Sequence, residues 1–137
     1  MITINNIMSV FIYEIASLKS GIIINTPKYP EGNKVVVRLG RLLGDLVANH
    51  KFSGFASHSS TCFCSWCACP KANIQKLTIG RLLQMWIFKD YSQAFNDLKN
   101  EAERARMVKK SGIKWSGLNR LCYWDPVHMI PIGIMHN

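Results

Sequence analysis

Apolar residues near the start of the chain recur every three or four positions, which is the spacing of one face of a helix. The members of this stripe are Ile7, Phe11, Ile15 and Leu18. The spacing predicts a helix over residues 4–19, and Gly21 ends it because glycine interrupts helical runs.

After this helix the pattern changes to short β-branched runs separated by turn residues. Ile22–Ile24 is one extended run and Val35–Val37 is a second. Between them lies Tyr29–Asn33, a turn signal built from proline, glycine and asparagine. The two runs predict a β-hairpin.

The second run continues as an apolar segment from Lys34 to Leu43, and Gly44-Asp45 then precedes a helical start at Leu46. This order predicts a strand that hands over to a helix, with Asp45 at the strand end. A carboxylate there lies at the rim of a sheet, where it faces solvent or a metal. The alternative is that Asp45 caps the N-terminus of the helix.

The later chain divides into a loop and a helical stretch. Residues 52–73 are rich in serine, glycine and cysteine without periodicity, so they predict a loop that a bound metal would order. Helical spacing returns from Gln75, and Asp90–Lys110 gives the clearest helix, with Gly112 as its C-cap. The apolar stripe of this helix consists of Tyr91, Ala94, Phe95, Leu98, Ala102 and Ala105.

The chain is strongly basic, and the charge is uneven. The net charge is +9, of which residues 1–33 contribute nothing, residues 34–60 contribute +3 and residues 61–120 contribute +7. This balance favours an acidic partner, and nucleic acid is the commonest large one, although solubility alone is the alternative. The candidate DNA-binding residues are Lys34, Arg38, Arg41, Lys51, Arg104, Arg106, Lys109 and Lys110. The last four also complement the dipole of a helix end, which leaves a solvated helix terminus open as an explanation.

Length and cysteine spacing bound the class of protein. The 137 residues, 48% of them hydrophobic, suit one small domain. The apolar run Ile7–Ile15 contains Glu14 and follows no basic residue, so it fits neither a secretory signal nor a membrane span. Four of the five cysteines lie between residues 62 and 69, which favours a reducing compartment, nuclear or cytoplasmic, over a disulfide framework.

Cys64 and Cys67 form a Cys-x-x-Cys pair, which supplies half of a tetrahedral zinc site. The candidate completions are His58 and His136. Cys62 and Cys69 are spare, because their spacing suits a single ion poorly. A redox pair and inert thiols are the alternatives, and the loop context disfavours redox chemistry because no helix N-terminus lowers a thiol pKa there.

Asp45 is the candidate catalytic carboxylate. A two-metal site for phosphoryl transfer needs several acidic ligands that converge. The chain has eight acidic residues, four of which lie between residues 90 and 103, and Asp125 precedes Pro126 as a turn residue. A complete active site is therefore not expected.

Seven stretches of the sequence, in order, carry a family resemblance: KVVV at 34–37, GDLVANHK at 44–51, GFASHS at 54–59, FCSWC at 63–67, SGIKWSGLNRL at 111–121, YWDPV at 123–127 and GIMHN at 133–137. Together they resemble the central part of the CACTA-type (En/Spm-like) DDE transposases of fungi, over about residues 11–137. That family uses three acidic residues and two divalent ions, magnesium, to cut and join DNA strands. Asp45 matches the second acid, and the other two are expected outside this sequence. Cys64 and Cys67 match the family's Cys-x-x-Cys, and His136 matches its Met-His-Asn motif.

The resemblance implies an α/β fold with a truncated RNase H-like core, a zinc knuckle and a helical insertion. Residues 1–137 would form one partial DDE catalytic domain. Its parts would be a sheet segment with the second acid at 20–52, a Cys-rich and helical insertion at 53–112, and a closing segment at 113–137.

The sequence thus predicts the remnant of a DNA transposase catalytic domain, inactive alone, that forms a homo-oligomer or joins a complementing transposase chain and has no membrane partner. The alternatives are a small zinc-stabilised nucleic-acid-binding module and a nonfunctional gene fragment. Marginal stability is also expected, because missing strands would strip apolar cover from Val35, Val37 and Leu39.

Overall fold

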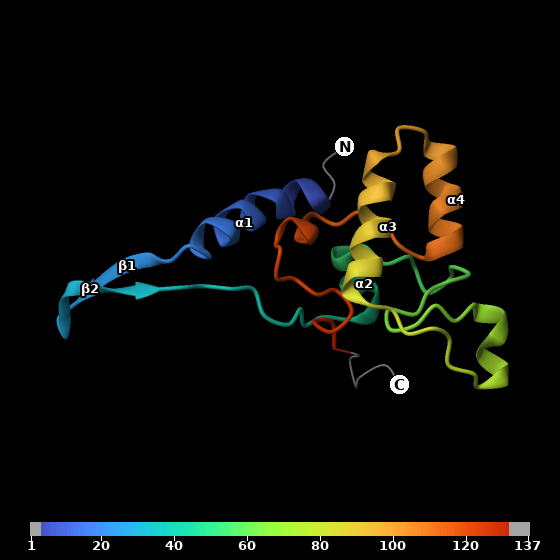
Figure 1. The fold of residues 1–137 in the computed structure, drawn as a ribbon, viewed down its shortest axis with the longest axis horizontal. Coiled ribbons are helices and arrows are strands. Elements are labelled where there is room, and N and C mark those ends of the chain that lie inside the picture. The colour runs from blue at the N-terminus through green and yellow to red at the C-terminus, as the bar shows by residue number, and fades with distance from the viewer. Residues whose placement is uncertain (1–3, 132–137) are drawn as a thin grey trace.

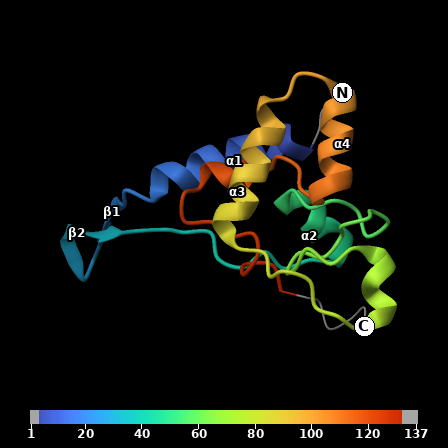
Figure 2. The same ribbon diagram turned by 45° about the vertical axis from the view of Figure 1, so that its right-hand side comes forward.

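Helix α1 (Ile4–Leu18) and a hairpin of β1 (Ile22–Thr26) and β2 (Tyr29–Val35) form an arm that extends from the rest of the protein (Figure 1). The computed structural model describes residues 4–131. The remaining elements are α2 (Leu46–Ser53), α3 (Met85–Asp97), α4 (Glu101–Ser111) and the 3-10 helices η1 (Lys71–Lys76) and η2 (Gly117–Arg120). Helices α3 and α4 lie side by side in both views (Figures 1 and 2). The predicted mixture of helix and strand is confirmed, and within the described residues the sheet has two strands.

The first predicted helix is confirmed, but its buried face differs from the predicted stripe. Ile12 is buried, and Met8 and Ile15 are partly buried beside it. Ile7 and Phe11 are 56% and 59% exposed. The reason is that α1 packs against η2 and the segment that follows it, and the side of the helix that carries Ile12 faces Leu118, Leu121 and Trp124.

The predicted hairpin is confirmed, with its turn earlier than expected. Strands β1 and β2 are antiparallel, and Ile22 pairs with Val35 and Ile24 with Asn33. The turn lies at residues 27–28, so the expected turn residues belong to β2. Gly32, at φ +90°, allows the strand to continue through a conformation that other residues rarely adopt.

The strand expected to run to Leu43 is wrong beyond Val35. Residues 36–43 have no regular secondary structure, and they lie against the closing segment of the chain. The Leu39 amide donates to the Tyr123 hydroxyl at 2.9 Å, and the Leu42 amide donates to the Met129 carbonyl at 2.9 Å. Side chains and backbone of the closing segment thus replace the partner strand that the sheet would have provided.

The single helix expected over 90–110 is wrong, because α3 and α4 are separate helices. Leu98 is extended, at φ −69° and ψ 132°, and the chain reverses before Asn100 caps α4 by accepting from the Ala102 amide at 2.9 Å. The predicted C-cap is confirmed, since Gly112 ends α4 in the left-handed conformation at φ +71°.

Two apolar clusters hold the body together, and the closing segment contributes to both. The first contains Phe55, Phe88, Ile113, Val127 and Ile130. The second contains Ile12, Leu118, Leu121 and Trp124, with Leu39 and Leu42 packed against it. The expectation that Leu39 lacks apolar cover is therefore wrong, because the Trp124 cluster provides it.

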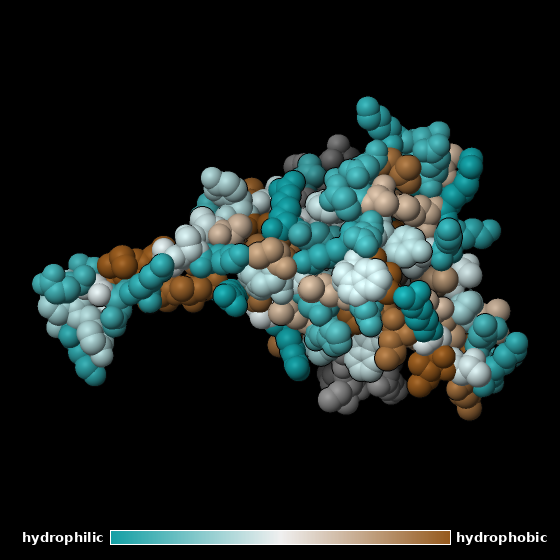
Figure 3. Space-filling view, in the orientation of Figure 1, coloured by the Kyte–Doolittle hydropathy of each residue, from teal (hydrophilic) through white to brown (hydrophobic). Residues whose placement is uncertain are grey.

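The hairpin itself has no apolar cover. Every residue of both strands is exposed except Gly32, and Val37, just beyond β2, is 39% exposed. Apolar side chains gather on the surface of this arm (Figure 3). Among the described residues, no helix is long and apolar enough to cross a membrane.

Candidate metal centre and basic surfaces

The Cys-rich loop is ordered by short backbone bridges rather than by a helix or sheet. Cys67 forms an isolated antiparallel bridge with Leu82, and Cys62 forms another with Pro70. The Leu83 amide donates to the Trp66 carbonyl at 2.8 Å. These bonds fix the backbone on both sides of the Cys-x-x-Cys pair.

Cys64 and Cys67 form a knuckle with sulfurs facing one another. Their Sγ atoms are 3.5 Å apart, and the amides of Trp66 and Cys67 each donate to the Cys64 Sγ at 3.4 Å. Two sulfurs bound to one tetrahedral zinc ion, each about 2.3 Å from it, are about 3.8 Å apart. The pair therefore fits two positions of a zinc site after a shift of a few tenths of an ångström.

The protonation of Cys64 ties metal binding to pH. Burial raises the pKa of the Cys64 thiol, and the amides of Trp66 and Cys67 oppose this rise. A metal ion binds the thiolate, so it must displace the thiol proton. The Trp66 and Cys67 amides would then donate to a charged sulfur, which strengthens both hydrogen bonds.

The other cysteines use their sulfurs differently. The Cys62 thiol donates to the Lys110 carbonyl at 3.6 Å, and the Cys69 thiol donates to the carbonyls of Pro70 and Thr78. All five cysteines are free of disulfides. The sulfurs of Cys62 and Cys69 therefore each lie against a backbone carbonyl.

His58, one of the two histidines expected to complete the site, does not join Cys64 and Cys67 in the described part of the chain. Over residues 4–131, no group of three or more Cys, His, Asp or Glu side chains is close enough to hold one metal ion. His58 instead shares a pocket with His50. His136 lies outside the described residues.

His50 is a buried residue that the sequence did not single out. Its Nδ1 donates to the Ala56 carbonyl at 3.0 Å, which places the ring proton on this nitrogen because a carbonyl only accepts. Burial lowers the pKa of His50, and the charge of nearby His58 lowers it further, while the bond to Ala56 opposes both. The only signal in the sequence for a buried His50 was its position in a helical segment that precedes Gly54.

Asp45 caps a helix instead of ending a strand. Its Oδ1 accepts from the Ala48 amide at 2.7 Å, at the start of α2. The alternative that the sequence left open, a helix N-cap, is therefore confirmed, and the strand-end position is wrong. Asp125, the other singled-out acid, closes a turn as predicted by accepting from the Val127 amide at 2.9 Å.

The predicted basic residues lie in separate places. Lys34 is on the hairpin arm, at the opposite end of the protein from α4 (Figure 1). Arg38 lies over the Tyr123 ring at 5.7 Å, Arg41 shares a pocket with Trp66, and Lys51 is in the last turn of α2. These residues therefore do not form one continuous patch.

Two of the four predicted basic residues of α4 lie together, next to a lysine beyond the helix that the sequence did not single out. Arg104 and Lys109 line one pocket together with Lys114, whereas Arg106 and Lys110 are exposed elsewhere on α4. Arg104 also pairs with Glu101 at 3.2 Å. The position of Lys114, two residues after a C-cap glycine, was the signal that could have identified it.

Comparisons with known proteins assign no family to the chain. No protein-family model, no curated protein and no solved structure matches the chain.

Proposed function

We propose that the chain is the remnant of a DDE transposase catalytic domain whose remaining activity is to bind zinc and DNA without cutting DNA. The observation that carries the proposal is the knuckle, where two amides donate to the Cys64 Sγ and the Cys67 Sγ is 3.5 Å away. A thiol pair with this geometry is suited to a structural zinc ion. The RNase H-like ancestry rests on the order of the sequence stretches named above.

The remaining zinc ligands come from outside the knuckle. His136 is the candidate that the family resemblance supplies, and it follows Pro131 by five residues. Pro131 lines the same pocket as Trp66, which is part of the knuckle. Five residues of chain reach at most about 18 Å, so this starting point is compatible with a ligand from that segment.

The engagement of Asp45 supports the absence of cutting. Its carboxylate holds the start of α2, and two-metal chemistry needs several carboxylates around the ions. In the proposal, magnesium-dependent cleavage would require a complementing chain or a second copy that brings further acids. A narrower function is a zinc-stabilised nucleic-acid-binding module of the nucleus or cytoplasm. The knuckle and the basic residues support this function equally, because it needs nothing else.

Metal analysis of the purified chain tests the knuckle. We expect one zinc ion per chain, lost in Cys64→Ser and in Cys67→Ser. Cys62→Ser and Cys69→Ser are matched controls and should keep the ion, because their thiols face backbone carbonyls. A zinc ion that survives Cys64→Ser would overturn the assignment.

DNA binding and cleavage test the rest. The wild-type chain should bind DNA more weakly as salt rises, since phosphate contacts release counterions. It should leave DNA uncut with magnesium. Strand cleavage that disappears in Asp45→Asn would show that the chain is an enzyme after all.

A further inference from the structure

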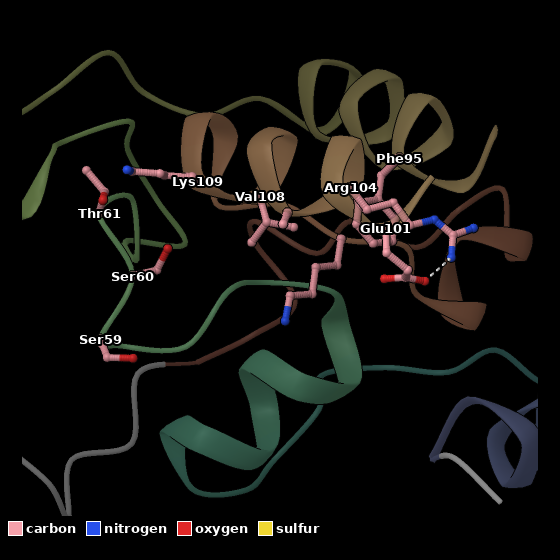
Figure 4. Close-up of a pocket in the computed structure, with 10 residues that line it drawn as sticks. Ser59, Ser60, Thr61, Phe95, Glu101, Arg104, Val108 and Lys109 are labelled. Atoms are coloured by element: carbon pink, nitrogen blue, oxygen red, sulfur yellow. Dashed lines mark hydrogen bonds and ion pairs between the residues drawn. The ribbon is translucent and has the colours of Figure 1, made fainter. Parts of the chain in front are cut away.

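A pocket of about 560 Å³ opens between α4 and the turn that carries Ser59, Ser60 and Thr61 (Figure 4). Its walls come from this turn, from helices α3 and α4, and from the residues just after α4. The turn contributes hydroxyl groups, α4 contributes Arg104 and Lys109, and Lys114 lies beyond the end of that helix. A pocket of this volume is large enough for one nucleotide.

The pocket carries an excess of positive charge. Glu101 pairs with Arg104, and its side chain is 87% exposed, so it neutralises one cation at the outer edge. The ion pairs found between described residues do not involve Lys109 or Lys114. Lys109 points from α4 toward the turn that carries Thr61 (Figure 4). The two lysine side chains and three hydroxyl residues that line the pocket offer hydrogen-bond donors of the kind that a phosphate accepts.

The wall at the other end of the pocket is formed by Arg104 and Phe95 (Figure 4). The Arg104 guanidinium lies over the Phe95 ring, 5.4 Å from its centroid. The Arg104 Nε donates to the Leu98 carbonyl at 2.8 Å and its terminal nitrogen donates to Glu101, so the guanidinium plane is held in place. Guanidinium planes and aromatic rings are the surfaces on which unpaired bases stack.

We propose that this pocket binds one unpaired nucleotide of a DNA strand. The phosphate would lie at Lys109, Lys114 and the hydroxyls of the turn, and the base would stack on the wall of Arg104 and Phe95. A paired base presents only its edge to a protein, so this wall selects single-stranded over duplex DNA. The inference rests on the proposed DNA binding and adds to it the form of the DNA and the site.

Fluorescence anisotropy with a labelled oligothymidine of about 10 nucleotides, and with a duplex of the same length, tests this pocket. The double variant Lys109→Gln/Lys114→Gln removes the two phosphate contacts. For the single strand, the slope of log K against log salt should fall in magnitude by about 1.4, which is two contacts at about 0.7 each. The matched control, Lys71→Gln/Lys76→Gln, removes the same charge from exposed positions on η1 outside the pocket, and it should leave most of this slope intact.

Phe95→Leu tests the stacking wall without changing charge. Single-strand affinity should fall about fivefold or more, and duplex affinity should stay unchanged. Phe95 is partly buried, so the thermal unfolding midpoint of the variant is measured alongside, and binding is compared well below that temperature. The lysine variants lie on the surface and keep the test decisive if Phe95→Leu unfolds.

The outcomes separate the two levels of the proposal. If wild-type protein binds neither DNA form, DNA binding itself is overturned. If it binds DNA but the Lys109/Lys114 variant behaves like the Lys71/Lys76 control, the pocket is overturned and general DNA binding stands. An equal loss of single-strand and duplex binding in Phe95→Leu would also overturn the selection of an unpaired base.

Discussion

The carboxylate of Asp45 accepts a hydrogen bond from the Ala48 amide at 2.7 Å, and this contact begins helix α2. The amides in the first turn of a helix have no partner within the helix, so an aspartate at this position satisfies one of them and places negative charge at the positive end of the dipole. The residue that most resembles a catalytic acid in the sequence therefore has a structural role that is independent of any metal.

The cap predicts different effects for two substitutions of Asp45. Asp45→Ala should lower the free energy of unfolding by about 1 kcal/mol, because the Ala48 amide loses its acceptor. Asp45→Asn should lower the free energy of unfolding by only about a few tenths of a kcal/mol, since the amide oxygen still caps the helix. Urea denaturation of both variants measures the difference. Equal losses would show that the charge, rather than the cap, stabilises α2.

Gly112 is predicted to be intolerant of a side chain. It adopts φ +71°, and a Cβ there would clash with the Cys62 carbonyl oxygen, because the end of α4 lies against the Cys-rich loop. Gly112→Ala should lower the free energy of unfolding by more than about 1 kcal/mol. Gly40→Ala is the control, because nothing lies within 4 Å of a Cβ at that position. Similar unfolding free energies for the two variants would contradict the close approach.

His50 predicts a loss of stability in acid. Its pKa is lowered in the folded protein by burial and by the charge of His58, from an ordinary value of 6.5. The unfolded chain therefore binds the proton first, and the free energy of unfolding decreases as pH falls through about 6.5 toward the lower folded pKa.

Urea denaturation at about pH 7.5 and about pH 5.5 measures this effect. The comparison is with His50→Asn, whose side-chain amide can still donate to the Ala56 carbonyl but does not titrate. The variant should lose less stability between the two pH values than the wild type does. The same pH dependence in both proteins would exclude His50 as the cause.

Cys122 should be the most rapidly alkylated thiol. The Lys19 ammonium donates to its Sγ at 2.7 Å and lowers the pKa of this exposed thiol, whereas burial raises the pKa of Cys64. Thiolates are the reactive form, so iodoacetamide near neutral pH should modify Cys122 before Cys64 in the presence of a chelator. Peptide mass spectrometry gives both rates. Lys19→Met should slow Cys122 alone, and an unchanged Cys122 rate would contradict the effect of Lys19.

Features set by neighbours in sequence were predictable. The hairpin, α1, the Gly112 C-cap and the Asp125 turn follow from propensity and capping chemistry over a few residues. The break between α3 and α4 was missed although Asn100 followed by Glu103 is a capping signal, because the apolar stripe continued across it. The capping signal and the apolar stripe therefore indicated different structures, and the prediction followed the stripe, which was wrong.

The order of motifs, the basic charge and the Cys-x-x-Cys spacing are properties of the sequence by itself, because they need no knowledge of distant contacts. The tertiary structure decided which residues meet. It placed Leu39 on the Trp124 cluster, turned Ile12 inward in place of Ile7, and joined Lys109 and Lys114 into one pocket with Ser59. These outcomes depend on packing between segments far apart in the chain, such as Ile12 and Leu118, which are 106 positions apart, and such contacts leave no periodicity in either segment.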